Sequence, residues 1–201
     1  DVTLKPLFET AAKYAYVINY YFENLGDDDF TADDTLKITG TDYAGETVTA
    51  NELDAAAVPE GFEFDSVNSV MSGTVKTDGS LELKVYYKRV RPDVKFFDSD
   101  RTTQVGATLN PKYGSKITPP AAPAAEKDGK PFCGWSTDGT LANIVDFNIY
   151  TVGTTAENFY AVYDNSTVQY NVIFTVNGAT VATTKVFGGG YATQPADPVV
   201  E

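Results

Sequence analysis

The feature that most constrains this chain is an internal repeat in its second half. Three short patterns recur in the same order: Pro92–Phe96 returns as Tyr170–Phe174, Lys112–Gly114 as Val186–Gly188, and Pro120–Pro123 as Pro195–Pro198. The offset is about 75 residues, which is typical of small modules strung in an array. The chain reaches Glu201 before any counterpart of Phe132–Trp135. We therefore expect 166–201 to be a truncated copy that forms a hairpin, either mobile or packed on a neighbour, because half a unit cannot bury its own apolar face.

Composition favours β-structure and narrows the range of partners. Hydrophobic residues make up 42% of the chain, and the aromatic ones include 13 Tyr and 12 Phe, which favour strands. The net charge of −13 argues against nucleic acid, whose phosphates need Lys and Arg, and against docking on anionic lipid. No apolar run is long enough to insert into a membrane. A self-repelling acidic surface favours a monomer.

The chemistry available to the chain is limited. It has no His and one Cys, which excludes Ser-His-Asp and Cys-His nucleophile systems, His-ligated zinc and an internal disulfide. We expect no enzymatic activity, no cofactor and no metal site. The acids at 27–29 and 33–34 could suit calcium, but their spacing fits no EF-hand loop and favours a solvated turn. An isopeptide bond between a buried Lys and an Asn beside an acid also remains open, since sequence alone cannot place such a group.

The first half predicts one small module over residues 15–90, after a linker or edge strand at 1–14. Aromatic and β-branched residues predict a strand at 15–23. Asn51 is a good N-cap, acids and Ala follow it, and Pro59 with Gly61 would stop a helix, so a short helix is expected over 51–57. Residues 62–67 and 70–76 are expected strands. Residues 81–88 alternate apolar and polar, which predicts a half-buried strand.

The second half predicts another module over residues 91–165. Its expected strands are 93–97, 131–135 and 158–164. The three prolines within 119–123 forbid a long helix between the first two strands. Arg91-Pro92 is a short linker with limited flexibility.

These residues resemble two known families. Residues 93–164 resemble the Listeria–Bacteroides repeat, also called the internalin B-repeat. The motifs are Val94/Phe96, Tyr113-Gly114, Pro120/Pro123, Phe132-Cys133-Gly134-Trp135 and Tyr160-Ala161-Val162-Tyr163. Residues 15–89 are similar to the mucin-binding-protein (MucBP-like) repeat, through Tyr16–Tyr20, Gly45, Gly61–Phe64 and Val85–Arg89. The resemblances imply an α+β fold of tandem β-grasp (ubiquitin-like) modules, mostly antiparallel or mixed β with one short helix. All-β modules are the alternative.

A few side chains are candidates for a role. Tyr20, Tyr21, Tyr86 and Tyr87 could form a ligand face, although sheet packing is the commoner use of such residues. Trp135 could stack on sugars, but Trp more often anchors a core. We expect Phe96, Phe132, Trp135 and Tyr160 to be structural core. Cys133 is expected to be a small packed residue, since no His or cationic cluster lies near it in sequence to activate the thiol.

The resemblances imply a Gram-positive cell-surface protein. The expected role is a non-enzymatic stalk or spacer of an adhesin-type protein, extracellular and attached to the wall as part of a longer secreted chain. The alternative is a binding module in which the first domain recognises mucin, a glycan or a host protein.

Overall fold

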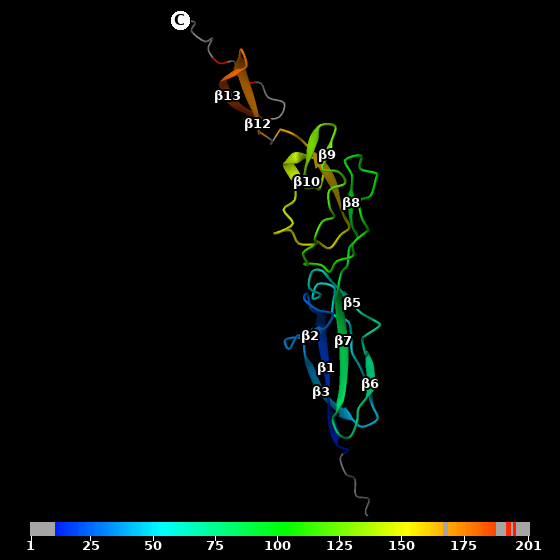
Figure 1. The fold of residues 1–201 in the computed structure, drawn as a ribbon. Helices are drawn as coiled ribbons and strands as arrows, with labels where there is room; N and C mark the ends of the chain where they lie inside the picture. Colours follow the sequence, from blue (N-terminus) through cyan, green and yellow to red (C-terminus); the bar gives the residue numbers. More distant parts are fainter. Residues whose placement is uncertain (1–10, 167–168, 188–191, 194, 196–201) are drawn as a thin grey trace, which may run out of the picture. The chain divides into compact units, whose positions relative to one another are not determined.

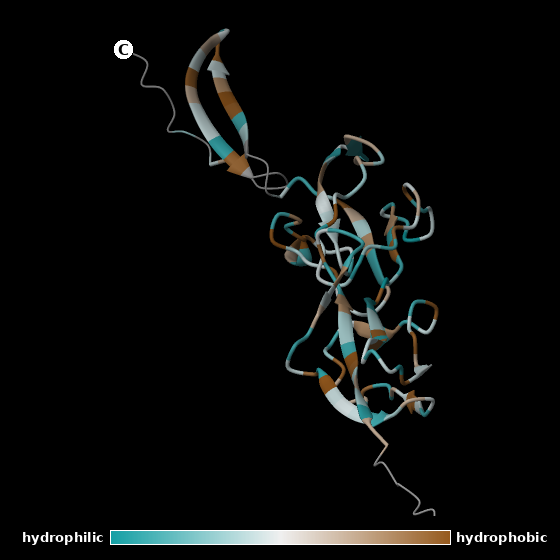
Figure 2. Cartoon of the chain, turned by 90° about the horizontal axis from the view of Figure 1, so that it is seen from below, coloured by the Kyte–Doolittle hydropathy of each residue, from teal (hydrophilic) through white to brown (hydrophobic). Residues whose placement is uncertain are grey.

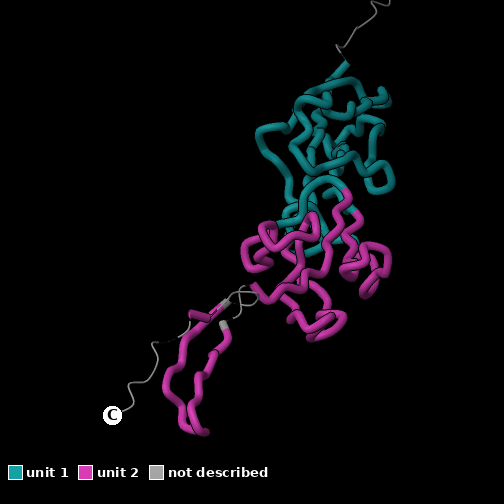
Figure 3. The backbone as a smooth tube through the Cα atoms, turned by 90° about the horizontal axis from the view of Figure 1, so that it is seen from above, with its two compact units in different colours: residues 1–92, 110–115, 151–155 teal, residues 93–109, 116–150, 156–201 magenta. Residues whose placement is uncertain are grey.

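The computed structural model describes residues 11–166, 169–187, 192–193 and 195 (Figure 1). Contacts divide the chain into two compact units (Figure 3). Unit 1 contains 1–92 together with 110–115 and 151–155, and unit 2 contains 93–109, 116–150 and 156–201. Two short segments from the second half of the chain therefore complete unit 1. Of the linker or edge strand expected at 1–14, residues 1–10 lie outside the described residues, and 13–14 form the start of β1. Residues 188–191 and 196–201 of the truncated copy also lie outside the described residues.

Unit 1 is built on a mixed five-stranded sheet. Its strands are β1 (Lys13–Glu23), β2 (Phe30–Ala32), β3 (Ile38–Tyr43), β5 (Phe62–Phe64) and β7 (Leu81–Arg89). The order is β2-β1-β7-β5, and β3 pairs with the first part of β1 on the same side as β2. β1 and β7, the first and last strands, are parallel neighbours (Figure 1). A separate antiparallel pair joins β4 (Thr47–Thr49) and β6 (Ser72–Thr74).

The core of unit 1 follows from alternation along the two central strands. Leu81, Leu83, Val85 and Tyr87 are buried on one face of β7, as the sequence pattern predicts. Ile18 and Tyr20 of β1 join them. Burying side chains of this size is the main stabilising contribution, about 1.5–3 kcal/mol for each large apolar group.

The helix predicted over Asn51–Ala57 is wrong. The segment is extended and ends in a turn, where the Ala57 and Val58 amides donate to the Asp54 carbonyl. Two core tyrosines hold its backbone instead: the Tyr20 hydroxyl donates to the Asn51 carbonyl, and the Leu53 amide donates to the Tyr87 hydroxyl. A helix of so few residues could not repay its nucleation cost against these tertiary bonds. The described residues contain no α-helix, which favours the all-β alternative.

Unit 2 has a four-stranded sheet of order β8-β11-β10-β9. Its strands are β8 (Val94–Phe97), β9 (Glu126–Lys127), β10 (Lys130–Ser136) and β11 (Glu157–Tyr163), and η1 (Leu141–Asn143) is a 3₁₀ turn. β8 and β11 are parallel, and the other pairs are antiparallel. Here too the first and last strands of the sheet lie side by side.

Within 166–201, where a hairpin was expected, the described residues form an antiparallel pair of β12 (Gln169–Val176) and β13 (Ala179–Phe187). Asn177 and Gly178 form the turn, with φ of 48° and 81°. Positive φ at both central residues is the signature of the tight turn that matches strand twist.

Candidate functional site

A buried carboxylate, that of Glu23, lies at the centre of a group of charged side chains in unit 1. Glu23, the last residue of β1, is only 5% exposed. Its Oε1 lies 2.9 Å from Lys112 Nζ and 2.7 Å from Arg91 Nη2. Its Oε2 accepts a hydrogen bond of 2.7 Å from the Arg89 backbone amide. Two cations and one amide therefore compensate this charge, as a buried charge requires.

Lys112 is the second buried member of this cluster. Its Nζ is also 3.0 Å from Asp28 Oδ1, and it donates to the carbonyl oxygens of Asn24 and Asp27. The ammonium thus has acceptors on several sides. We call Glu23, Asp28, Arg91 and Lys112 the ion cluster; all four belong to unit 1.

The pKa shifts keep the ion cluster charged. Burial acts to raise the pKa of Glu23, but hydrogen bonds from Lys112 and the Arg89 amide and the charge of Arg91 outweigh it and lower the pKa. Burial acts to lower the pKa of Lys112, but bonding to Glu23 and Asp28 raises it. Lys112 Nζ contacts carboxylates and backbone carbonyls and no Asn side chain, so the arrangement is an ion pair and does not favour the Lys–Asn isopeptide bond that the sequence left open.

In the acidic run at 27–29 and 33–34, the carboxylates of Asp27 and Asp33 accept hydrogen bonds that stabilise local turns. Asp27 Oδ1 accepts hydrogen bonds from Asn24 Nδ2 and the Asp29 amide. Asp33 Oδ1 accepts from the amide and hydroxyl of Thr35, which lowers the pKa of Asp33. Within the described residues, no group of three acids or other ligands could hold a metal ion.

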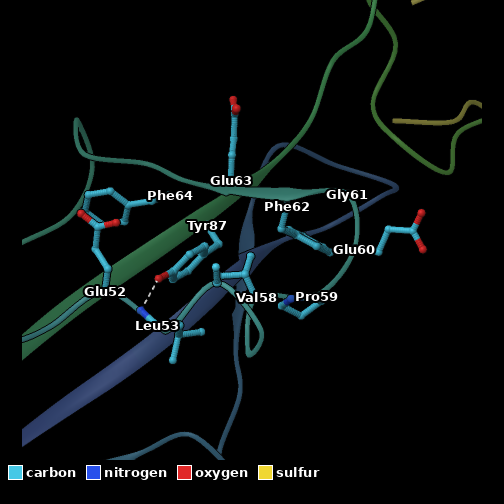
Figure 4. A pocket seen from close by; sticks show the side chains of 11 residues that line it. Glu52, Leu53, Val58, Pro59, Glu60, Gly61, Phe62, Glu63, Phe64 and Tyr87 are labelled. Atoms are coloured by element: carbon cyan, nitrogen blue, oxygen red, sulfur yellow. Dashed lines mark hydrogen bonds between the residues drawn. The ribbon is translucent and has the colours of Figure 1, made fainter. Parts of the chain in front are cut away.

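A pocket of about 420 Å³ opens in unit 1 between the segment after Asn51 and strand β5 (Figure 4). Its apolar lining includes Leu53, Val58, Phe62, Phe64 and Tyr87. The three glutamates on its rim do not converge. Figure 4 shows Glu60 and Glu63 directed away from the hollow. Glu63 Oε1 lies 3.4 Å from Nζ of Lys88, a residue outside the pocket lining. Paired carboxylates for acid–base chemistry are therefore absent from this pocket, which could accept an apolar group.

The four candidate tyrosines separate into two pairs. Tyr20 and Tyr87 are 4% and 1% exposed, and their hydroxyls bond to the backbone as described above. Tyr21 and Tyr86 lie on the outer face of the sheet, where their rings stack 4.9 Å apart. The remaining ring faces are also in contact, since Lys84 Nζ lies 5.9 Å from the Tyr21 ring and Phe30 meets Tyr86 edge-on. The structure does not bring the four together: one pair lies in the core and the other on the outer face.

The four residues expected in the core of unit 2 also differ in burial. Phe96 and Trp135 are 1% and 3% exposed, and their rings meet edge-on at 5.0 Å. The Trp135 indole N–H donates to the Pro120 carbonyl, which joins the strand to the Pro-rich segment. Phe132 is half-buried and contacts Trp135, whereas half-buried Tyr160 stacks on Phe97.

The Phe-Cys-Gly-Trp motif forms β10 and carries a β-bulge. The register against β11 shifts between Phe132 and Gly134, and Gly134 has a φ of 146° with its missing Cβ directed at Ile144. The Cys133 thiol contacts the carbonyls of Asp164 and Pro131. The bulge and the positive φ at Gly134, where a Cβ would lie 2.9 Å from Ile144, explain why a glycine stands at this position.

The comparisons with known proteins point to the same segment. Residues 94–162 match the family model of the Listeria-Bacteroides repeat domain. β8 opens this repeat domain and β11 closes it. A relative from Evansella cellulosilytica, described as "Putative membrane protein", is 35% identical over 106 residues. The match covers 52% of this chain and 15% of that relative, so the chain spans a small part of the relative's length. Among the described residues, no helix has the length and apolar character needed to cross a bilayer.

Sequence reasoning missed the ion cluster. One signal was available, because the repeat places Lys112 where the truncated copy has Val186. When one copy of a repeat has a charged residue where the other copy has an apolar one, the charge indicates a contact that is specific to that copy. The partner of Lys112 is Glu23, the last residue of a strand rich in aromatic residues, and no sequence pattern around Glu23 predicts that it is buried.

Proposed function

We propose that this chain is a non-enzymatic stalk or spacer segment of a bacterial cell-surface protein of adhesin type. The observation that carries the proposal is the repeat domain at 94–162, followed by a partial copy of the same pattern. Modules that repeat along a chain build length, because each one contacts only its neighbours in the chain. The divergent glutamates of the unit 1 pocket and the absence of His from the chain support a role without catalysis.

The strand plan of each unit supports the spacer role. In unit 1 the chain enters at the start of β1 and leaves at the end of β7, which runs parallel to it. Entry and exit are then at opposite ends of the sheet. Nine residues of β7 at about 3.3 Å each separate them by about 30 Å. An antiparallel pair would return the chain to its starting end and add no length. The parallel β8–β11 pair gives unit 2 the same property.

The finer identity is part of the proposal. First and last strands that pair in parallel within a mixed sheet are consistent with β-grasp modules, a MucBP-like one at 15–89 and a B-repeat one at 93–164. The proposal also includes a Gram-positive source, attachment to the cell wall outside the cell, and a monomeric state.

A length series tests the stalk role. Zero, one, two or three copies of the 201-residue chain are placed between a wall anchor and a distal fluorescent domain on a bacterial surface. The distance from the distal domain to the membrane, measured by super-resolution imaging, should rise with each copy by at least the length of unit 1, about 30 Å. A distance that does not change with copy number would refute the proposal. As a control, a flexible Gly/Ser linker of equal residue count should give a rise that shrinks with each added copy, because its span grows as the square root of length, whereas the stalk should add the same distance each time.

The unit 1 pocket favours a second candidate function, recognition of mucin, a glycan or a host protein by the first module. Its apolar lining, which includes Leu53 and Phe64, could accept an apolar group of such a ligand. The test is binding of the chain to mucins and a broad glycan panel. Phe64→Ala should abolish saturable binding, whereas Phe30→Ala on the outer face should leave it intact. A folded chain that binds nothing on the panel would remove this candidate and leave the stalk role standing.

A further inference from the structure

The hairpin of β12 and β13 presents an apolar face that no strand covers among the described residues. Bands of high and low hydropathy alternate along it (Figure 2). Register places three side chains of β12 and three of β13 on one face: Tyr170, Val172 and Phe174, opposite Val186, Thr184 and Ala182. Tyr170 is 44% exposed, although it lies within a strand. The other face carries the polar groups Asn171, Thr183 and Lys185 together with Ile173, which is 58% exposed. A two-stranded hairpin with one mainly apolar face is marginal in water, so this face needs a partner.

Unit 2 provides the template for that partner. By the repeat, Val172 corresponds to Val94 and Phe174 to Phe96. In unit 2 these two residues are 0% and 1% exposed. Phe96 is covered by Trp135 of β10 at 5.0 Å and by Phe159 of β11 at 5.2 Å. In unit 2, strands β10 and β11 therefore cover the residues that correspond to this face of the hairpin.

The backbone edge of β12 indicates the same partner. β8 pairs in parallel with β11, with Phe96 opposite Phe159 and Val94 opposite Glu157. β12 pairs with β13 along one edge, and its other edge has no partner strand in the described part of the chain. An unpaired edge beside an exposed apolar face is a template for strand addition.

We infer that the β12–β13 hairpin is a docking surface for a strand pair of the β10–β11 type. The occupant is a segment with a Phe-x-Gly-Trp strand followed by a Tyr-Ala-x-Tyr closing strand. The closing strand pairs in parallel with the free edge of β12, with its counterpart of Phe159 opposite Phe174. The Trp of the first strand covers the Phe174 ring.

An extended chain tests this inference. Pro198–Glu201 aligns with Pro123–Glu126, so a second copy of residues 127–164 is fused directly after Glu201, at the spacing found in unit 2. Hydrogen exchange of the peptide amides in 169–176 is measured by mass spectrometry in the original and the extended chains. Exchange in the extended chain should slow by at least about tenfold, because amides of a fraying hairpin open almost freely and those of a core strand do not.

Two matched variants of the extended chain locate the contact. Phe174→Asp places a charge on the apolar face and should restore fast exchange. Thr183→Asp places the same charge on the opposite face and should leave the protection in place. Exchange that stays fast in the unaltered extended chain, or protection that survives Phe174→Asp, would overturn the inference. Protection in the original chain that grows with protein concentration would identify a second copy of this chain as the occupant, which also overturns it.

Discussion

Replacing Lys112 with Met should destabilise unit 1 more than any surface charge change, because it leaves Glu23 buried with one cation fewer. Removing one partner of a buried ion pair typically costs about 3–5 kcal/mol. Glu23 keeps Arg91 Nη2 at 2.7 Å and the Arg89 amide at 2.7 Å, so part of its compensation survives. We expect a loss of about 2–3 kcal/mol in the free energy of unfolding.

The assay is urea unfolding followed by the NMR amide signals of β1 and β7, which report on unit 1 itself. Lys88→Met is the matched control, since Lys88 and Glu63 are 46% and 54% exposed and such pairs contribute little. A double-mutant cycle of Lys112→Met with Glu23→Gln should give a coupling energy of at least about 1 kcal/mol. A Lys112→Met loss below about 0.5 kcal/mol, or additive single changes, would refute the reasoning, because surface substitutions behave that way.

The pH dependence follows from the direction of each shift. The pKa of Glu23 is lowered from its ordinary value of 4.5, so its contribution is present above that value and is lost as the pH falls through the lower folded-state pKa. The pKa of Lys112 is raised from 10.5, so its contribution is complete below that value and is lost as the pH rises further. The stability difference between the parent chain and Glu23→Gln should therefore be constant near neutral pH and shrink in acid. A difference that grows below pH 4.5 would contradict this sign.

Two further substitutions test the packing of unit 1. Gly61 has a φ of 79°, and a Cβ there would lie 1.9 Å from the Tyr113 ring, so Gly61→Ala should cost about 3 kcal/mol in urea unfolding. In Gly45→Ala the φ is 93° and no atom lies within 4 Å of the new Cβ, so the substitution should cost only the backbone strain, about 1–2 kcal/mol. Equal losses for Gly61→Ala and Gly45→Ala would disprove the contact between residue 61 and the Tyr113 ring.

Tyr87→Phe removes the acceptor of the Leu53 amide and should lower the unfolding free energy by about 1–2 kcal/mol, against less than about 0.5 for the outer-face Tyr21→Phe.

The strands were largely predictable because their alternation is local. The pattern from Leu81 to Tyr87 sets which side chains point inward, and the structure buries those four. The hairpin at 169–187 was predictable from the repeat. β5 and β6 are shorter than expected. β6 ends with its short partner β4, and β5 ends at Phe64 because the Asp65 carboxylate accepts hydrogen bonds from the amides of Val67 and Asn68 and turns the chain.

What sequence could not supply was long-range contact. The segment at 51–57 has good helix signals, but hydrogen bonds from Tyr20 and Tyr87, distant in sequence, decide its backbone. The alternation of β7 separates Tyr87 from Tyr86, but the aromatic run of β1 has no such alternation, so only the sheet shows that Tyr20 points inward and Tyr21 outward. The ion cluster joins positions 23 and 112, and no pattern links them.

The parallel pairing of β1 and β7 leads to a mechanical prediction for unit 1. Force applied between residues 13 and 89 shears the two strands past each other, so the seven registered pairs from Tyr16↔Leu81 to Phe22↔Tyr87 bear load together. Force applied between residues 13 and 43 acts on Lys13 and Tyr43, which are partners at one end of the antiparallel β1–β3 pair. That pair opens one register position at a time. In single-molecule pulling, unfolding through 13 and 89 should therefore need the higher force, although the folded unit and its free energy of unfolding are the same in both experiments. Equal forces would show that the parallel ladder does not bear the load, and would remove the physical basis for a stalk built on this sheet.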